Sequence, residues 1–299
     1  MTHRPFFDGW VGKIIDFPQL GTMSRWRLVT KLGDLNDQES ALDYLEWQAP
    51  SGAYGTFRCR NVDHPDELAV VKIFVQSVLR LHEHMTGSTQ LASYIRIPYA
   101  GSDFAIHDER ARQATDSLTP FGRDQINALT TLTENNCSST PTLVAKREFK
   151  QDSTGPVPGG FMVYLLMQHH PGVQLNKRVF WNLEPSERQQ MREAFKEALT
   201  YVCTFLFNIS PSGPQDSKIT FWVYSECIDC GIWPTLSKLH WDKSLGKVFI
   251  HGFRLSRPSN ETHYWMDTLW ICWDLAEAPK SYDWPRNTDP HPDMSDWTL

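Results

Sequence analysis

The run Leu68-Ala-Val-Val-Lys-Ile-Phe-Val75 is the stretch of sequence that decides the fold class. It is apolar and rich in β-branched side chains, with a lysine, Lys72, inside it, which is typical of a buried strand. The run Ala53-Tyr-Gly-Thr-Phe-Arg-Cys59 lies shortly before it and alternates apolar with polar side chains, as a half-buried strand does. Together the two runs predict neighbouring strands of an antiparallel sheet.

Two more strands and a helix are expected after this pair. The apolar runs at residues 142–144 and 161–167 predict strands, with a turn region rich in Gly, Pro and Ser between them. Residues 120–133 carry apolar side chains at helical spacing and predict a helix. Residues 76–116 are polar and rich in His, Ser and Arg, which indicates an insertion or a long loop.

The strongest helical pattern lies at residues 185–207, where the apolar positions form one stripe along a helix. The break His169-His-Pro-Gly172 follows the strands and marks the expected boundary between two lobes. The stripe consists of Met191, Ala194, Phe195, Ala198, Leu199, Val202, Cys203 and Leu206. The remaining expectations are strands at 221–224, 239–241 and 247–253, a buried Trp-rich helix at 267–276 and an extended tail at 279–299.

Composition limits the class of protein. The chain has 299 residues, which fits two domains or one bilobal unit, and it is long enough to bury a core without disulfides or metals. It has no signal-peptide pattern and no apolar run of membrane-spanning length, and its six cysteines are scattered. We therefore expect a cytoplasmic protein with no membrane segment. The net charge of −6 argues against a broad nucleic-acid surface, but it is compatible with a local basic groove.

The order of these elements resembles that of the protein-kinase fold. Gly52-Ala-Tyr-Gly55-Thr-Phe57 resembles a shortened Gly-rich loop, and Ala69-Val-Val-Lys72 resembles the lysine strand motif of kinases. Over residues 45–278 the chain resembles the fungal kinase-like proteins related to aminoglycoside phosphotransferases. The other stretches that carry this resemblance are Thr140-Pro-Thr-Leu, Pro158-Gly-Gly-Phe-Met-Val-Tyr, Phe180-Trp with Glu187-Arg188, and Asp267-Thr-Leu-Trp-Ile-Cys-Trp-Asp-Leu-Ala276.

The resemblance implies an α+β fold with two lobes. Residues 1–168 would form an N-terminal lobe, an antiparallel sheet with one helix and the insertion at 76–116. Residues 169–299 would form a mostly helical lobe with an extended C-terminal tail. Gly52, Gly55 and Lys72 would stand at the nucleotide-binding positions of the cleft between the lobes, where a small molecule or a protein is the expected ligand.

The acidic residues of a kinase are missing from the positions where the resemblance places them. Gln125 replaces the helix glutamate, Lys238 or Ser237 replaces the asparagine that binds magnesium, and Gly252 replaces the aspartate of the DFG turn. We therefore expect a pseudokinase that transfers no phosphate, with no cofactor and no metal. A shifted alignment that uses Asp229 or Asp242 leaves a divergent small-molecule phosphotransferase as an alternative.

A second alternative is an enzyme that uses the cleft between the lobes for a reaction other than phosphoryl transfer. Lys72, Asp274 and Glu277 are then the candidate catalytic residues, since the two acids are three apart and would share a helix face. Fungal specialised metabolism offers one such group, the arginine-containing cyclodipeptide synthases, which use aminoacyl-tRNA. Their acidic motif is half matched at Asp274 and Glu277, and a tRNA partner would require the basic residues to cluster.

The remaining motifs favour ordinary structural roles. Cys227-Ile-Asp-Cys230 lacks the further ligands of a zinc site, with His240 as the nearby candidate. The pair His169-His170 is expected in an exposed linker. The tryptophans at 222, 233, 241, 265, 270 and 273 are expected mostly in the core of the C-terminal part.

Overall fold

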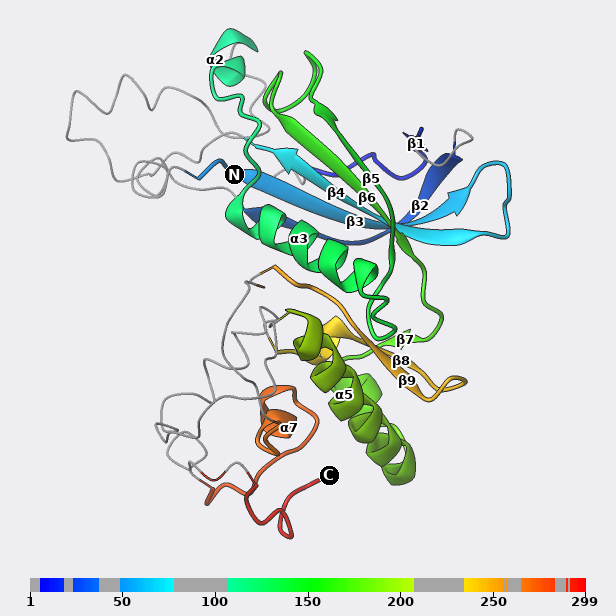
Figure 1. Ribbon diagram of the computed structural model, residues 1–299, viewed down its shortest axis with the longest axis vertical. Coiled ribbons are helices and arrows are strands. Elements are labelled where there is room, and N and C mark those ends of the chain that lie inside the picture. Colours follow the sequence, from blue (N-terminus) through cyan, green and yellow to red (C-terminus); the bar gives the residue numbers. More distant parts are fainter. Residues whose placement is uncertain are drawn as a thin grey trace, which may run out of the picture. The chain divides into compact units, whose positions relative to one another are not determined.

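The computed structural model describes residues 6–18, 24–37, 49–77, 107–206, 234–254, 256, 265–282, 289 and 291–299. The chain divides into two compact units (Figure 1). Unit 1 comprises Met1–Arg123 and Leu143–His169, and unit 2 comprises Asp124–Thr142 and His170–Leu299. The strand expected at 221–224, the cysteines at 227 and 230 and most of the insertion at 76–116 lie outside the described residues.

Unit 1 is built on a six-stranded antiparallel sheet with the strand order β1-β2-β3-β4-β6-β5. The runs predicted as strands form β3, β4, β5 and β6, so these predictions are confirmed, whereas β1 and β2 were not predicted. The strands are β1 (Ile14–Phe17), β2 (Ser24–Asp37), β3 (Gly52–Asn61), β4 (Leu68–Gln76), β5 (Leu143–Lys150) and β6 (Phe161–Gln168). The short helix α2 (His107–Ala111) also belongs to unit 1, and α3 (Pro120–Glu134) confirms the predicted helix.

The sheet of unit 1 curls until its two edge strands approach each other. The guanidinium of Arg147 in β5 donates a hydrogen bond to the backbone oxygen of Asp16 in β1, with an N–O distance of 2.7 Å. Strand β2 has register shifts between Leu28 and Thr30 and between Lys31 and Gly33, and such bulges bend and twist a strand. The result is a nearly closed, barrel-like sheet.

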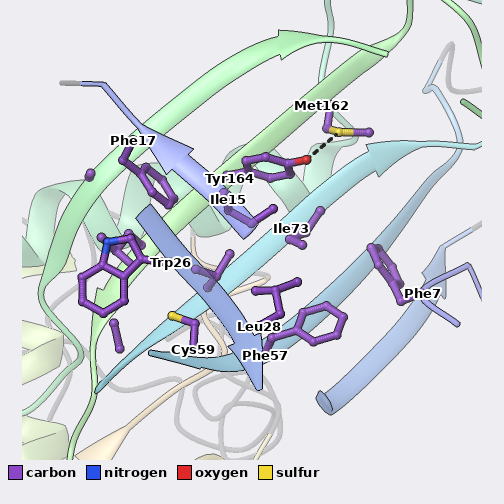
Figure 2. Close-up of a cluster of buried hydrophobic side chains, with 14 of the residues drawn as sticks. Phe7, Ile15, Phe17, Trp26, Leu28, Phe57, Cys59, Ile73, Met162 and Tyr164 are labelled. Atoms are coloured by element: carbon purple, nitrogen blue, oxygen red, sulfur yellow. Dashed lines mark hydrogen bonds between the residues drawn. The ribbon is translucent and has the colours of Figure 1, made fainter. Parts of the chain in front are cut away.

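The core of unit 1 fills the inside of this curled sheet (Figure 2). Alternate residues of β4 and β6 face inward, because successive side chains of a strand point to opposite faces. Tyr164 and Met162 meet there, and the tyrosine hydroxyl donates to the methionine sulfur at 3.3 Å. The inward set consists of Phe7, Ile15, Phe17, Trp26, Leu28, Ala53, Phe57, Cys59, Ala69, Val71, Ile73, Val75, Ala145, Met162, Tyr164 and Leu166.

Unit 2 combines the long helix α5 (Pro185–Leu206) with a small antiparallel sheet. The sheet consists of β7 (Val173–Gln174), β8 (Leu239–Asp242) and β9 (Lys247–Ile250), and α5 lies beside β9 (Figure 1). The stripe predicted for α5 is buried, apart from the partly exposed Ala194 and Leu206, so the helix prediction is confirmed. The other helices are α4 (Lys177–Trp181), α7 (Leu269–Cys272) and the 3-10 turn η3 (Leu236–Lys238).

The expected kinase-like fold with a mostly helical C-terminal lobe is wrong. The described chain is mostly antiparallel sheet, with five α-helices, and the sheet of unit 1 is barrel-like rather than open. The long strand β2, with its two bulges, curls the sheet so that β5 meets β1. In unit 2 the expected helix at 267–276 shortens to one turn, Leu269–Cys272, and the tail at 291–299 folds back to pair with Glu277.

Candidate functional site

Lys72 lies in β4 on the outer face of the barrel-like sheet. Its backbone pairs with Thr56 and Leu165, and its side chain is only partly exposed. The amine lies 5.4 Å from the ring centroid of Phe74 and 5.9 Å from that of Tyr54. A cation beside aromatic faces gains about 0.5–1 kcal/mol in a partly exposed place. The structure thus places Lys72 on an aromatic face of unit 1, whereas Asp274 and Glu277 belong to unit 2.

Gly52 and Gly55 lie within strand β3, not in a loop. Both are buried, and both pair with β2 on one side and β4 on the other. A Cβ on Gly52 would come within 2.7 Å of the Thr119 methyl, and a Cβ on Gly55 would come within 2.8 Å of the Phe7 ring. Packing against these neighbours therefore explains the two glycines.

Asp274 and Glu277 do not share a helix face, because α7 ends at Cys272. Asp274 has a left-handed backbone with φ of 58° and forms an ion pair with Lys177 at 2.8 Å. Glu277 pairs through its backbone with Thr298. The hydrogen bond from Lys177 to Asp274 raises the pKa of the lysine, and the charge of Glu277 raises it further. Asp274 thus forms a surface ion pair, and Glu277 acts on the same lysine through its charge.

A polar cluster that the sequence analysis did not assemble lies on one face of the β8–β9 ribbon. In the ladder His240 lies opposite Phe249, and the backbone N–H of His251 donates to Lys238 O at 2.9 Å. With alternating side chains, this register puts the polar residues and Phe249 on one face and the other apolar residues on the opposite face. We call the first the histidine face; it consists of Lys238, His240, Asp242, Lys247, Phe249 and His251.

The opposite face of the same ribbon holds the histidine face in place. Leu239, Val248 and Ile250 are buried there, and the indole N–H of Trp241 donates to Glu187 of α5 at 3.0 Å. Burying several apolar side chains of this size contributes about 1.5–3 kcal/mol each. The hairpin is therefore anchored by its apolar side, which fixes the positions of the polar side chains.

One end of the histidine face is positively charged, because the charge of Arg254 acts on the amine of Lys238 there. Gly252 follows β9 with φ of +90°, and the side chain of Lys238 lies across it, so that a Cβ there would be 3.0 Å from Nζ. The backbone N–H of Arg254 donates to Gly252 O at 2.9 Å. Burial and the positive charge of Arg254 lower the pKa of the Lys238 amine. Among the described residues, no carboxylate lies within ion-pair distance of Lys238. We call Lys238 and Arg254 the basic end.

Imidazoles occupy the middle of the histidine face. The ring centroids of His240 and His251 are 4.6 Å apart with an interplanar angle of 54°. His170 stacks on Phe249 with a centroid distance of 3.8 Å. The three rings are partly buried, and they lie between the basic end and Asp242.

Asp242 closes the far end of the histidine face and is 3% exposed. Its Oδ1 accepts hydrogen bonds from Ser244 Oγ at 2.6 Å, Ser244 N at 2.9 Å and Leu245 N at 3.2 Å. These bonds, with a smaller effect from the charge of His170, lower the pKa of Asp242. Its Oδ2 is buried and has no hydrogen-bond partner among the residues that the structure describes. The carboxylate thus supplies a negative charge to the imidazole side.

The sequence contained a partial signal for this cluster. The kinase resemblance placed two magnesium-ligand positions at Lys238 or Ser237 and at Gly252, and the structure brings Lys238 and Gly252 into contact. The residue types there are a cation and a glycine. In the described part of the chain no group of three or more His, Cys, Asp or Glu side chains is placed to hold a metal ion. The arrangement suits an anion.

A scan against protein-family models gives no match, and a search of curated proteins finds none with significant similarity. Among the described residues no helix has the length and apolar character needed to cross a membrane.

Proposed function

We propose that the protein binds a phosphate monoester at the basic end of the histidine face and does not transfer its phosphoryl group. One observation carries the proposal: the partly buried side chain of Lys238 lies across Gly252, and its amine is within electrostatic reach of the charge of Arg254. Two like charges in a partly desolvated place raise the free energy of the cationic state. A bound anion offsets this cost.

The charge of the basic end favours a phosphate group over a single carboxylate. Lysine and arginine together present two positive charges, and a phosphate monoester carries about −1.5 to −2 at neutral pH. An arginine guanidinium binds phosphate oxygens with two parallel hydrogen bonds, and a lysine adds a point charge. The imidazoles of His251 and His240 lie next to the basic end and are further donors when protonated.

The proposal keeps ligand binding from the sequence-based expectations but places it at different residues. Asp274, a candidate catalytic acid, is paired with Lys177, which supports a structural role for it. For the aminoacyl-tRNA and phosphotransfer alternatives, no observation in the described residues gives specific support.

Equilibrium dialysis with radiolabelled inorganic phosphate tests this proposal. We expect saturable binding at one site by the full chain and a loss of affinity in Lys238→Met, because a hydrogen bond to a charged group contributes about 1.5–3 kcal/mol, or roughly 10- to 100-fold in Kd. Lys247→Met is the matched control, since Lys247 is an exposed lysine at the start of β9. Equal phosphate affinity in the two variants would show that the basic end is not the site.

A further inference from the structure

We propose that the phosphate site takes up protons together with its ligand through His251 and His240, so that its affinity for a dianion rises as the pH falls. This inference rests on the proposed function and adds the regulation of that site. It follows from the position of the two imidazoles, which lie on the same face as Lys238 and next to it.

Because the two imidazoles lie close to Lys238, their protonation depends on whether an anion is bound there. His251 is the ladder neighbour of Lys238. The ring centroids of His240 and His251 are 4.6 Å apart. Imidazole ordinarily titrates near pH 6.5, and a nearby positive charge disfavours its protonated form. Without an anion, imidazolium ions here would add to the charges of Lys238 and Arg254. A bound dianion replaces this repulsion with an attraction to imidazolium, so it favours proton uptake by the two rings.

Binding and protonation are then linked in both directions. If a dianion favours protonation, protonation increases the affinity for the dianion by the same factor. The dianion reaches Lys238 and Arg254 at one end, whereas Asp242 lies at the opposite end, next to His170. The carboxylate therefore stabilises a proton on the imidazole side without occupying the basic end.

The charged and titratable groups around His240 and His251 come from several elements. On the histidine face they are Lys238 from η3, Asp242 from β8, Lys247 from β9, His170 over Phe249, and Arg254 after β9, while the β7 neighbour Gln174 is uncharged. On the opposite face the α5 carboxylate of Glu187 is bonded to Trp241 and Lys243.

Sulfate is the probe that separates protein titration from ligand titration, since it stays a dianion across the relevant pH range. The Kd for radiolabelled sulfate is measured by equilibrium dialysis of the full chain from pH 8 to pH 5.5 at constant ionic strength. We expect the Kd to fall by about three- to tenfold per pH unit around the imidazole pKa. Calorimetry in buffers of different ionisation enthalpy should show net proton uptake on binding.

Two variants and one control identify the titrating groups. His240→Gln and His251→Gln should each flatten the pH dependence of the sulfate Kd. His64→Gln, which changes an exposed histidine of unit 1, should behave as the wild type.

Sulfate binding with a pH-independent Kd would overturn the proton linkage and leave the phosphate site standing. An unchanged pH dependence in the double variant His240→Gln, His251→Gln would overturn it as well. No sulfate binding at any pH would overturn both proposals.

Discussion

Lys238 and Gly252 are in direct contact: an added Cβ on the glycine would lie 2.7 Å from Cδ of the lysine and 3.0 Å from its Nζ. The glycine has φ of +90°, a conformation that other residues rarely adopt. The contact holds the amine at the end of the histidine face, where the charge of Arg254 acts on it. The absence of a side chain at Gly252 thus leaves the space that the Lys238 side chain occupies.

Replacing Gly252 by alanine should both destabilise unit 2 and weaken phosphate binding. The positive φ alone should cost about 1 kcal/mol, and the methyl group must displace the Lys238 side chain. Gly246→Ala is the matched control, because Gly246 has φ of +61° but nothing within 4 Å of its Cβ position. Urea unfolding should show a loss in both variants, while dialysis should show weaker phosphate binding in Gly252→Ala alone. Normal binding by Gly252→Ala would contradict the positioning role.

Lys238→Met should raise the stability of the protein at neutral pH, by up to about 1 kcal/mol, because it removes a charge that burial disfavours. The pKa of Lys238 lies below its ordinary value of 10.5 in the folded chain. Between these two pKa values the unfolded chain binds more protons, so wild-type stability rises with pH in that window. The advantage of the variant should therefore be largest at neutral pH and shrink toward pH 10.5. Urea unfolding at several pH values checks this, and a less stable Lys238→Met protein at pH 7 would refute it.

Gly55→Ala should destabilise the barrel-like sheet by about 1–3 kcal/mol, since the new methyl would overlap the rings of Phe7 and Phe57 at 2.8 Å. Gly33 in β2 has nothing within 4 Å of its Cβ position, so Gly33→Ala serves as the comparison and should cost much less. Thermal unfolding of both variants distinguishes a packing role from a ligand-binding role. Equal melting temperatures for Gly55→Ala and wild type would argue against packing as the reason for this glycine.

Asp274→Asn and Asp274→Ala should separate the charge of Asp274 from its backbone conformation. The ion pair with Lys177 is largely exposed and contributes roughly 0–1 kcal/mol. Asparagine tolerates the observed φ of 58°, whereas alanine does not do so easily. Denaturant unfolding should therefore show a small loss for Asp274→Asn and a larger one for Asp274→Ala. Equal losses in the two variants, which both lack the charge, would mean that the charge and not the backbone conformation dominates.

Local patterns predicted several elements but not their closure into a barrel. The apolar runs of β4 and β6 and the stripe of α5 are strong signals, because each buries a continuous apolar surface. Strand β2 has exposed Val29, Leu32 and Leu35 beside polar residues, and its two bulges break the alternation. The meeting of β5 with β1 depends on that bending, which no local pattern encodes.

The candidate site could be predicted only in part, because it is made by strand register. Leu239-His-Trp-Asp242 and Val248-Phe-Ile-His251 each alternate an apolar residue with a polar or aromatic one, which predicts two distinct faces. The pairing of His240 with Phe249 and the stacking of His170 on that ring require the tertiary structure. The same is true of the contact between Lys238 and Gly252, whose φ is invisible in the sequence.

The most direct test of the basic end is the pKa of the Lys238 amine, measured by NMR of 15N-labelled lysine with and without sulfate. Lys238→Met identifies the resonance by its absence. Without the anion the pKa should lie below 10.5, because burial and Arg254 disfavour the ammonium. With saturating sulfate it should rise, since the anion favours the charged form. An unchanged pKa in the presence of sulfate would contradict the assignment of this site to an anion.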